Sequence, residues 1–137
     1  MWSAYRLHKA WEFSEVFKQG KKVINSEFVV FYLPNQLNTC RFGISVPRKM
    51  VKKATQRNYC KRQIKNILAS SFLREHKIIC PFNQPNHYDL VIVIRPNFLT
   101  VNDFSAKQKS LVELLDLIPQ KKVHLNNLVK NKRTPYA

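Results

Sequence analysis

Acidic residues are scarce in this chain of 137 residues and missing altogether from its middle. The chain has 8 Asp and Glu against 24 Lys and Arg, a formal net charge of +16. Between Phe28 and Arg74 there is no acid, while ten Lys or Arg fall in that interval. Because a surface of one charge sign repels itself, this distribution indicates a polyanionic partner. Nucleic acid is favoured over an anionic membrane, since no segment combines the charge with a long apolar helical face.

The few acids are also dispersed, which bears on catalysis. Metal-assisted cleavage of phosphodiesters needs carboxylates clustered around the ions. Here the eight acids are scattered over the chain and none lies in the basic middle: Glu12, Glu15, Glu27, Glu75, Asp89, Asp103, Glu113 and Asp116. The four histidines form no ligand pattern either, so the sequence names no catalytic residue and no metal site. A stand-alone nuclease is therefore disfavoured.

Cysteines and long apolar runs are few as well. The three cysteines, Cys40, Cys60 and Cys80, fit neither a disulfide framework nor the short spacing of a zinc site, so we expect buried free thiols. No apolar run approaches the roughly 18 residues that cross a bilayer. The N-terminus carries charges where a signal peptide has its apolar core, so we expect a cytoplasmic protein that does not bind membranes.

What is present predicts one folded domain of the α+β class. The chain is 45% hydrophobic, enough to fold, and its length suits a single core. Periodicity predicts helices over 9–19, 55–73 and from about 100 to Pro119, the last capped by Thr100 or Asn102. Three of the four expected strands have clear bounds, at 27–33, 39–46 (antiparallel to its predecessor) and 88–94. The order αβββαβα predicts helices on a mostly antiparallel four-stranded sheet, with a domain at 1–119 and a mobile basic tail at 120–137.

The helix predicted over 55–73 has two different faces. At 100° per residue, an apolar face of Cys60, Ile64, Ile67 and Leu68 is opposed by a polar stripe. The stripe contains no acid that could pair with its cations at i,i+4, so the like charges are mildly destabilising. An ordinary solvated face is the alternative, but this cost favours a binding face composed of Asn58, Lys61, Arg62 and Lys65.

The segment before this helix adds further cations. Pro47 detaches it from strand hydrogen bonding, so it can wrap charge around a polyanion; its basic residues are Arg48, Lys49, Lys52 and Lys53. Arg57 falls at the edge of the apolar face, where we expect it in a groove that suits a phosphate. Asn58 beside it can bind a ribose hydroxyl or a neighbouring backbone.

These residues resemble a known family. The stretch "RFGISVPRKMVKKATQRNYCKRQIK" is similar to the signature of the bacterial ribonuclease P protein subunit, with its glycine-led strand, basic pair and Arg-Asn helix start. The resemblance extends to "RLHKAWEFSEVFKQGKKV", "FVVFYLPN", "YDLVIVIRP" and the final Leu-rich helix, and covers roughly Arg6 to Leu117. Tyr59 stands where the family pattern has a further arginine, although its ring can stack on a base. Phe31 stands where the family usually has tyrosine.

The resemblance implies a fold and a function. The fold would be a two-layer α/β sandwich of the ribosomal-protein-S5-domain-2 type, with a left-handed β-α-β crossover through the basic helix. The protein would bind one catalytic RNA as a monomer and help it remove the 5′ leader of precursor tRNA. Cleavage would lie in the RNA, with magnesium and no covalently bound cofactor. The Arg-Asn helix would contact the RNA, and a cleft of Phe13, Phe17, Val29 and Phe31 would hold the leader.

Two alternatives accompany this expectation. A ribosomal or other structural RNA-binding protein would be equally basic, and the Arg-Asn helix together with the aromatic first helix favours the ribonuclease P subunit. For the cleft, the competing interpretation is that Phe13 and Phe17, at i,i+4, are simply core residues. Aromatics beside a basic rim do suit unpaired nucleotides, because stacking contributes about 1–3 kcal/mol per base.

Overall fold

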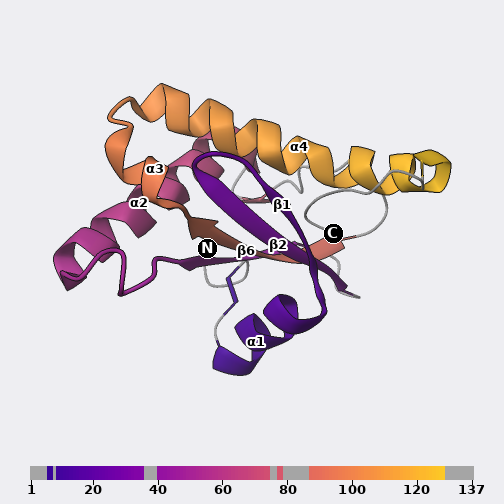
Figure 1. Cartoon of the computed structure of the whole chain (residues 1–137), viewed down its shortest axis with the longest axis horizontal. Helices are drawn as coiled ribbons and strands as arrows, with labels where there is room; N and C mark the ends of the chain where they lie inside the picture. Colours follow the sequence, from indigo (N-terminus) through magenta and orange to yellow (C-terminus); the bar gives the residue numbers. More distant parts are fainter. Residues whose placement is uncertain (1–5, 8, 36–39, 75–76, 79–86, 129–137) are drawn as a thin grey trace.

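The helices lie on both faces of one sheet (Figure 1). The computed structural model describes residues 6–7, 9–35, 40–74, 77–78 and 87–128. Its elements, in chain order, are α1 (Ala10–Gln19), β1 (Lys21–Ile24), β2 (Phe28–Asn35), β3 (Arg41–Ser45), α2 (Ala54–Phe72), β4 (Leu73–Arg74), β5 (Lys77–Ile78), β6 (His87–Ile94), α3 (Pro96–Thr100) and α4 (Phe104–Leu128).

The main sheet has four strands in the order β1-β2-β6-β3. β2 is antiparallel to both β1 and β6, while β3 pairs with β6 in parallel. β3 and β6 are therefore parallel neighbours joined through α2, which forms the expected β-α-β crossover. β3 runs opposite to β2 as predicted, but β6 lies between the two strands. The α+β class and the mostly antiparallel sheet are confirmed.

The sheet is buried to different extents on its two faces. The larger core lies under α2 and α4 and contains Phe28, Val30, Leu90 and Ile92 from the central strands. A smaller core of Leu7, Val16 and Val91 lies under α1 on the opposite face. Figure 1 shows this separation, with α4 and α1 on opposite sides of the strands. The continuous apolar run in β6 follows from its central place between β2 and β3, where both faces are covered.

The start and the end of α4 differ from the prediction. The backbone N–H of Ser105 donates to Asp103 Oδ1 at 3.0 Å, so Asp103 caps the helix rather than Thr100 or Asn102. Pro119 does not end α4, which continues to Leu128. A proline removes one hydrogen bond and kinks a helix, and good helix formers after it can carry the helix on. Of the tail predicted at 120–137, residues 120–128 belong to α4 and 129–137 lie outside the described residues, so its mobility stays a prediction.

The cysteines and the short elements differ in part from the prediction. Cys60 is a buried free thiol as predicted, whereas Cys40, equally buried, is disulfide-bonded, so the expectation of a free thiol there was wrong. Residue spacing along the chain does not reveal such a pairing, which depends on tertiary proximity. The short elements α3, β4 and β5 were not predicted. Within the described ranges, no helix is long and apolar enough to span a bilayer.

Candidate nucleic-acid interface

Helix α2 has the two faces that its sequence predicted. Cys60 is 5% exposed, and Ile64, Ile67 and Leu68 are fully buried against the main core. On the opposite side, Asn58 and Arg62 are exposed, while Lys61 and Lys65 are partly exposed. The ion pairs found in the described ranges both involve Arg41, so no carboxylate is paired with this stripe there. The stripe can therefore bind an anion without first breaking an internal salt bridge.

The basic segment before α2 is held in a defined turn. The backbone N–H groups of Met50 and Val51 both donate to the carbonyl oxygen of Pro47 at 3.0 Å. Val51 is 4% exposed and anchors the segment in the core. As a result the cations around it all project into solvent: Arg48, Lys49, Lys52 and Lys53 are exposed.

Arg57 links this segment to the helix. Its Nη1 donates to the carbonyl oxygens of Val51 at 3.0 Å and of Lys52 at 2.8 Å. Arg57 is partly buried, and its described side-chain contacts are with the chain's own backbone. The phosphate contact expected for Arg57 stays a prediction. These two bonds tie the backbone of Val51 and Lys52 to the first turn of α2.

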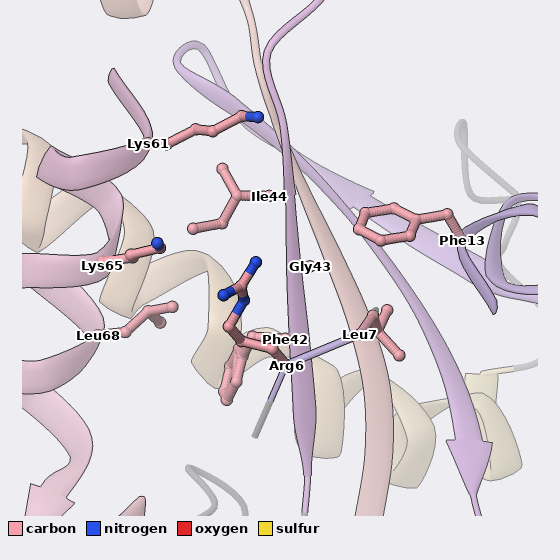
Figure 2. A pocket seen from close by; sticks show the side chains of 9 residues that line it. All are labelled: Arg6, Leu7, Phe13, Phe42, Gly43, Ile44, Lys61, Lys65 and Leu68. Atoms are coloured by element: carbon pink, nitrogen blue, oxygen red, sulfur yellow. The ribbon is translucent and has the colours of Figure 1, made fainter. Parts of the chain in front are cut away.

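The outer edge of β3 brings another cation close to the stripe. Arg6 forms a parallel bridge with Phe42, and Leu7 N–H donates to the Phe42 carbonyl oxygen at 3.0 Å. A cavity of about 170 Å³ at this edge is lined by Arg6, Gly43, Ile44, Lys61 and Lys65, among others. Figure 2 shows the charged ends of Arg6, Lys61 and Lys65 on the α2 side of β3, with Phe13 and Leu7 on the other. We call Arg6, Lys61 and Lys65 the edge cations.

Sequence reasoning missed Arg6 as part of this interface. Arg6 lies 55 positions before Lys61 in the chain, and its place depends on pairing between the N-terminal segment and β3. The stretch that begins at Arg6 resembles the family's first helix, and that resemblance gave Arg6 no role. The sequence offered one weak signal for Arg6, namely that a basic residue directly precedes an apolar one. In the structure that apolar residue, Leu7, is 3% exposed.

The aromatic residues of α1 lie over the opposite face of the sheet. Phe13 covers Gly43 so closely that a Cβ at that glycine would lie 2.6 Å from the Phe13 ring. Phe17 meets Phe31 edge to face, with ring centroids 4.9 Å apart, and remains 41% exposed. Lys22 places its ammonium 5.8 Å from the Phe31 ring centroid.

Val29 lies on the same sheet face, one row further along. It pairs with Val93, which packs against the smaller core, and both side chains are partly exposed. The structure therefore places Phe13, Phe17, Val29 and Phe31 on one face. Phe13 is covered to a greater extent than Phe17, which supports the core interpretation for Phe13 alone.

The acids near this surface are used in structural contacts. Arg41 binds Asp89 through two hydrogen bonds of 3.0 and 2.8 Å and Glu12 through one of 2.9 Å. These contacts hold the pKa of the Arg41 guanidinium above its usual value, with the Asp89 hydrogen bonds as the main cause. Among the described residues, no group of His, Cys, Asp or Glu could hold a metal ion.

The fold and the site together define a nucleic-acid-binding protein that presents cations and aromatic rings. The part of the chain that the structure describes contains no carboxylate cluster of the kind found in nucleases. Comparison with known proteins narrows this class. The family model described as Ribonuclease P matches residues 1–118. The ribonuclease P protein component of Mycoplasma mobile is 32% identical over 114 residues, which is 83% of this chain and 89% of that protein. The one from an Azoarcus species is 33% identical over 85% of this chain and 88% of that protein.

Solved structures agree with the sequence comparisons. The RNase P protein of Staphylococcus aureus superposes with a TM-score of 0.66 at 27% identity, covering 83% of this chain and 94% of that one. The RNase P protein of Thermotoga maritima gives 0.64 at 30% identity, covering 80% and 94%. The chain belongs to the ribonuclease P protein family.

The function of the protein follows from its membership in this family. It is the protein subunit of the ribonuclease P endoribonuclease, which works with the ribonuclease P RNA in tRNA 5′ processing, and the catalytic role lies in that RNA. The resemblance seen in the sequence is confirmed. The alternative of a ribosomal protein without a role in tRNA processing is set aside.

Proposed function

We propose that the basic surface around α2 holds the ribonuclease P RNA, while the α1 face of the sheet holds the single-stranded 5′ leader of precursor tRNA. In this proposal the RNA surface comprises Asn58, Arg62, the edge cations and the exposed cations at 48–53. The leader surface comprises Phe17, Phe31, Val29 and the rim of Phe13. The two nucleic acids would then lie on opposite sides of β3.

The observation that carries the RNA surface is the convergence of cations from two separate parts of the chain. Arg6 comes from the N-terminal segment and Lys61 and Lys65 from α2, and all three line one cavity. A phosphate placed there would meet several cations whose positions are fixed by the sheet edge and the helix. Arg57 helps to position this surface, because it donates to the carbonyl oxygens of Val51 and Lys52 and so restricts the basic segment.

The leader surface is supported by the exposed aromatic pair. Phe17 keeps 41% of its surface exposed even though it contacts Phe31, so a ring face remains accessible for stacking. Lys22 lies above Phe31 and supplies a cation for the leader backbone. A surface of this kind binds unpaired nucleotides with little sequence preference, as leaders of different tRNAs require.

The protein's contribution to cleavage is positioning and charge. Bond breaking would take place in the RNA with magnesium, and this chain would act as one monomer per RNA in the cytoplasm. Reducing the repulsion between RNA and substrate would lower the magnesium concentration that the reaction needs. If about six phosphates are neutralised, log K for RNA binding should fall with log salt at a slope of roughly −4 to −5.

Reconstitution tests this proposal. The purified protein alone should not cut precursor tRNA, and it should restore cleavage by a bacterial ribonuclease P RNA at low magnesium. Lys61→Ala with Lys65→Ala should weaken RNA binding and reduce the salt slope by about two. Lys109→Ala, which removes one exposed charge from α4, is the control and should leave both unchanged. Cleavage without RNA, or an unchanged slope in the double variant, would overturn the corresponding part.

A further inference from the structure

A second and larger cavity lies beside α2, away from the edge of β3. Its volume is about 380 Å³, and it opens between the basic segment, the first turns of α2, α3 and the start of α4. Its lining includes Met50, Tyr59, Gln63, Phe98, Leu99 and Lys107. We call it the α2–α3 cavity. Lys52 of the basic segment also lines it, so the cavity adjoins the proposed RNA surface.

Lys107 is the unusual group in this cavity. It is only 6% exposed, yet its ammonium has no carboxylate partner among the described residues. Nζ lies 4.1 Å from the centroid of the Phe98 ring and 3.2 Å from Gln63 Oε1. Burial lowers the pKa of Lys107 from its ordinary value, which shows that the charge is held at a cost. An ammonium has three donors, so these two contacts leave capacity for a further acceptor.

The cavity combines apolar walls with unused polar groups. Phe98 and Met50 supply apolar surface, and Leu99 at the rim is 41% exposed. Gln63 is oriented by a 3.2 Å hydrogen bond from its Nε2 to the Tyr59 hydroxyl. Gln56 and Asn102 also line the cavity, and their side-chain amides make no hydrogen bond within the part of the chain that the structure describes.

These features favour a flat, neutral ligand with carbonyl and amino groups at its edge. A phosphate would have to lose water for a single buried ammonium and apolar walls, which is costly. A nucleobase avoids that cost, since its faces pack against apolar and aromatic side chains. Its edge can accept from a lysine and exchange hydrogen bonds with Gln or Asn amides. Tyr59, 55% exposed, supplies a ring at the entrance.

We propose that the α2–α3 cavity receives one unpaired nucleobase of the bound RNA, with Lys107 donating to a base carbonyl and Tyr59 stacking at the entrance. The inference rests on the proposed function, because it requires RNA to run along the basic segment beside Lys52. It assigns a binding role to α4 and to Tyr59. The contact is with a base, so it adds affinity without adding a phosphate contact.

Free nucleosides provide the first test, because they carry no phosphate. Adenosine, guanosine, cytidine and uridine are titrated separately into the full-length protein, and side-chain amide signals are followed by NMR. At least one nucleoside should shift the signals of Gln63, Gln56 or Asn102, while inorganic phosphate should leave them unmoved. The proposal fails if phosphate shifts these signals and no nucleoside does.

Variants in the complex with ribonuclease P RNA provide the second test. Lys107→Met should weaken RNA binding about tenfold while the salt slope stays that of the wild type, because no phosphate contact is lost. Lys109→Met removes the same charge from an exposed position two residues away and should bind like the wild type. A reduced slope in Lys107→Met would indicate a phosphate site, and an unchanged affinity would indicate an empty cavity. Either result overturns the proposal.

Substitutions of Tyr59, at the entrance of the α2–α3 cavity, test the proposal even if Lys107→Met fails to fold. Tyr59→Ala changes an exposed side chain and should weaken binding to a similar degree, whereas Tyr59→Phe keeps the ring and should recover most of the affinity. Equal losses in both Tyr59 variants would contradict stacking. Failure of the wild type to bind ribonuclease P RNA would instead refute the proposed RNA surface, so the two failures are distinguishable.

Discussion

Replacing Arg41 by Met should destabilise the protein strongly, because this residue joins β3 to both β6 and α1. Its guanidinium binds Asp89 on β6 through Nε and Nη2 and Glu12 on α1 through Nη1. Asp89 is only 8% exposed, and Arg41 keeps 22% of its side chain exposed. Met preserves much of the apolar contact while it removes all three bonds.

The magnitude follows from the carboxylate that is left behind. Without Arg41, Asp89 retains the 2.7 Å hydrogen bond from Asn35 but has no other ion-pair partner among the described residues. Breaking a buried ion pair from one side costs about 3–5 kcal/mol. Partial exposure of Arg41 lets solvent screen the charge, which reduces the expected loss in the free energy of unfolding to about 2–3 kcal/mol. At roughly 3–5 °C per kcal/mol for a domain of this size, Tm should fall by about 10 °C.

Urea denaturation and thermal melts followed by circular dichroism measure this effect. Arg48→Met is the matched control, because Arg48 is exposed and should change stability by about 0.5 kcal/mol or less. At a temperature where Arg41→Met is folded, the salt dependence of its RNA binding should match that of the wild type. Its affinity for the leader should fall, because α1 loses its ion pair with Arg41. A loss of stability below about 1 kcal/mol would refute the argument that Arg41 neutralises a buried carboxylate.

Three further predictions concern single positions. Gly43→Ala should lower the free energy of unfolding by about 1–2 kcal/mol in urea melts, because the new Cβ meets the Phe13 ring at 2.6 Å. Adding Phe13→Leu to this variant should restore part of the lost stability. If the losses of the two substitutions are additive, the contact is excluded. Hydrogen bonds, first that with Ser110, lower the pKa of Glu27 from 4.5, so its stabilisation is present above that pH and lost as the pH falls through the folded-state value. Glu27→Gln should therefore flatten the acid side of the stability curve, and an unchanged curve would exclude this role. Because burial lowers the pKa of Lys107 below 10.5, stability should rise from the folded-state pKa up to 10.5. Lys107→Met should lose that rise and Lys109→Met should keep it, and a rise that persists in Lys107→Met would assign it to other groups.

Local periodicity was enough to predict the parts of the fold that face one core. In α2, the spacing of Cys60, Ile64, Ile67 and Leu68 required one buried side, and all four are buried. The continuous run in β6 likewise required a central strand. Strand neighbours were harder, because β3 pairs with β6 through a parallel register that α2 makes possible and no hairpin signal encodes. Pro119 shows the limit of a local rule, since one missing hydrogen bond did not outweigh the helix formers that follow it.

The position of a candidate residue could be predicted where it depends on one element, and it was missed where it depends on several. The stripe on α2 needed only helical geometry. Arg6 and Lys107 needed knowledge of which distant segments meet α2, and for Lys107 the sequence pattern was misleading. Its neighbours Leu111, Leu114 and Leu115 define the buried face of α4, and a lysine one turn earlier resembles a solvated end of that face. Only the packing of Phe98 against it shows that the ammonium is enclosed.

β3 is the element that relates the two proposed surfaces to each other. Gly43 faces Phe13 on the α1 side, while Ile44 lines the cavity of the edge cations on the α2 side. Gly43 and Phe13 also line that cavity, so the proposed leader and RNA surfaces adjoin within one residue step of β3. β3 is hydrogen-bonded to β6 and tied to α1 through Arg41, so the elements that carry the two proposed surfaces are directly connected. Under the proposed function this connection would fix the leader relative to the catalytic RNA, and loosening Arg41 should impair leader positioning before it impairs RNA binding.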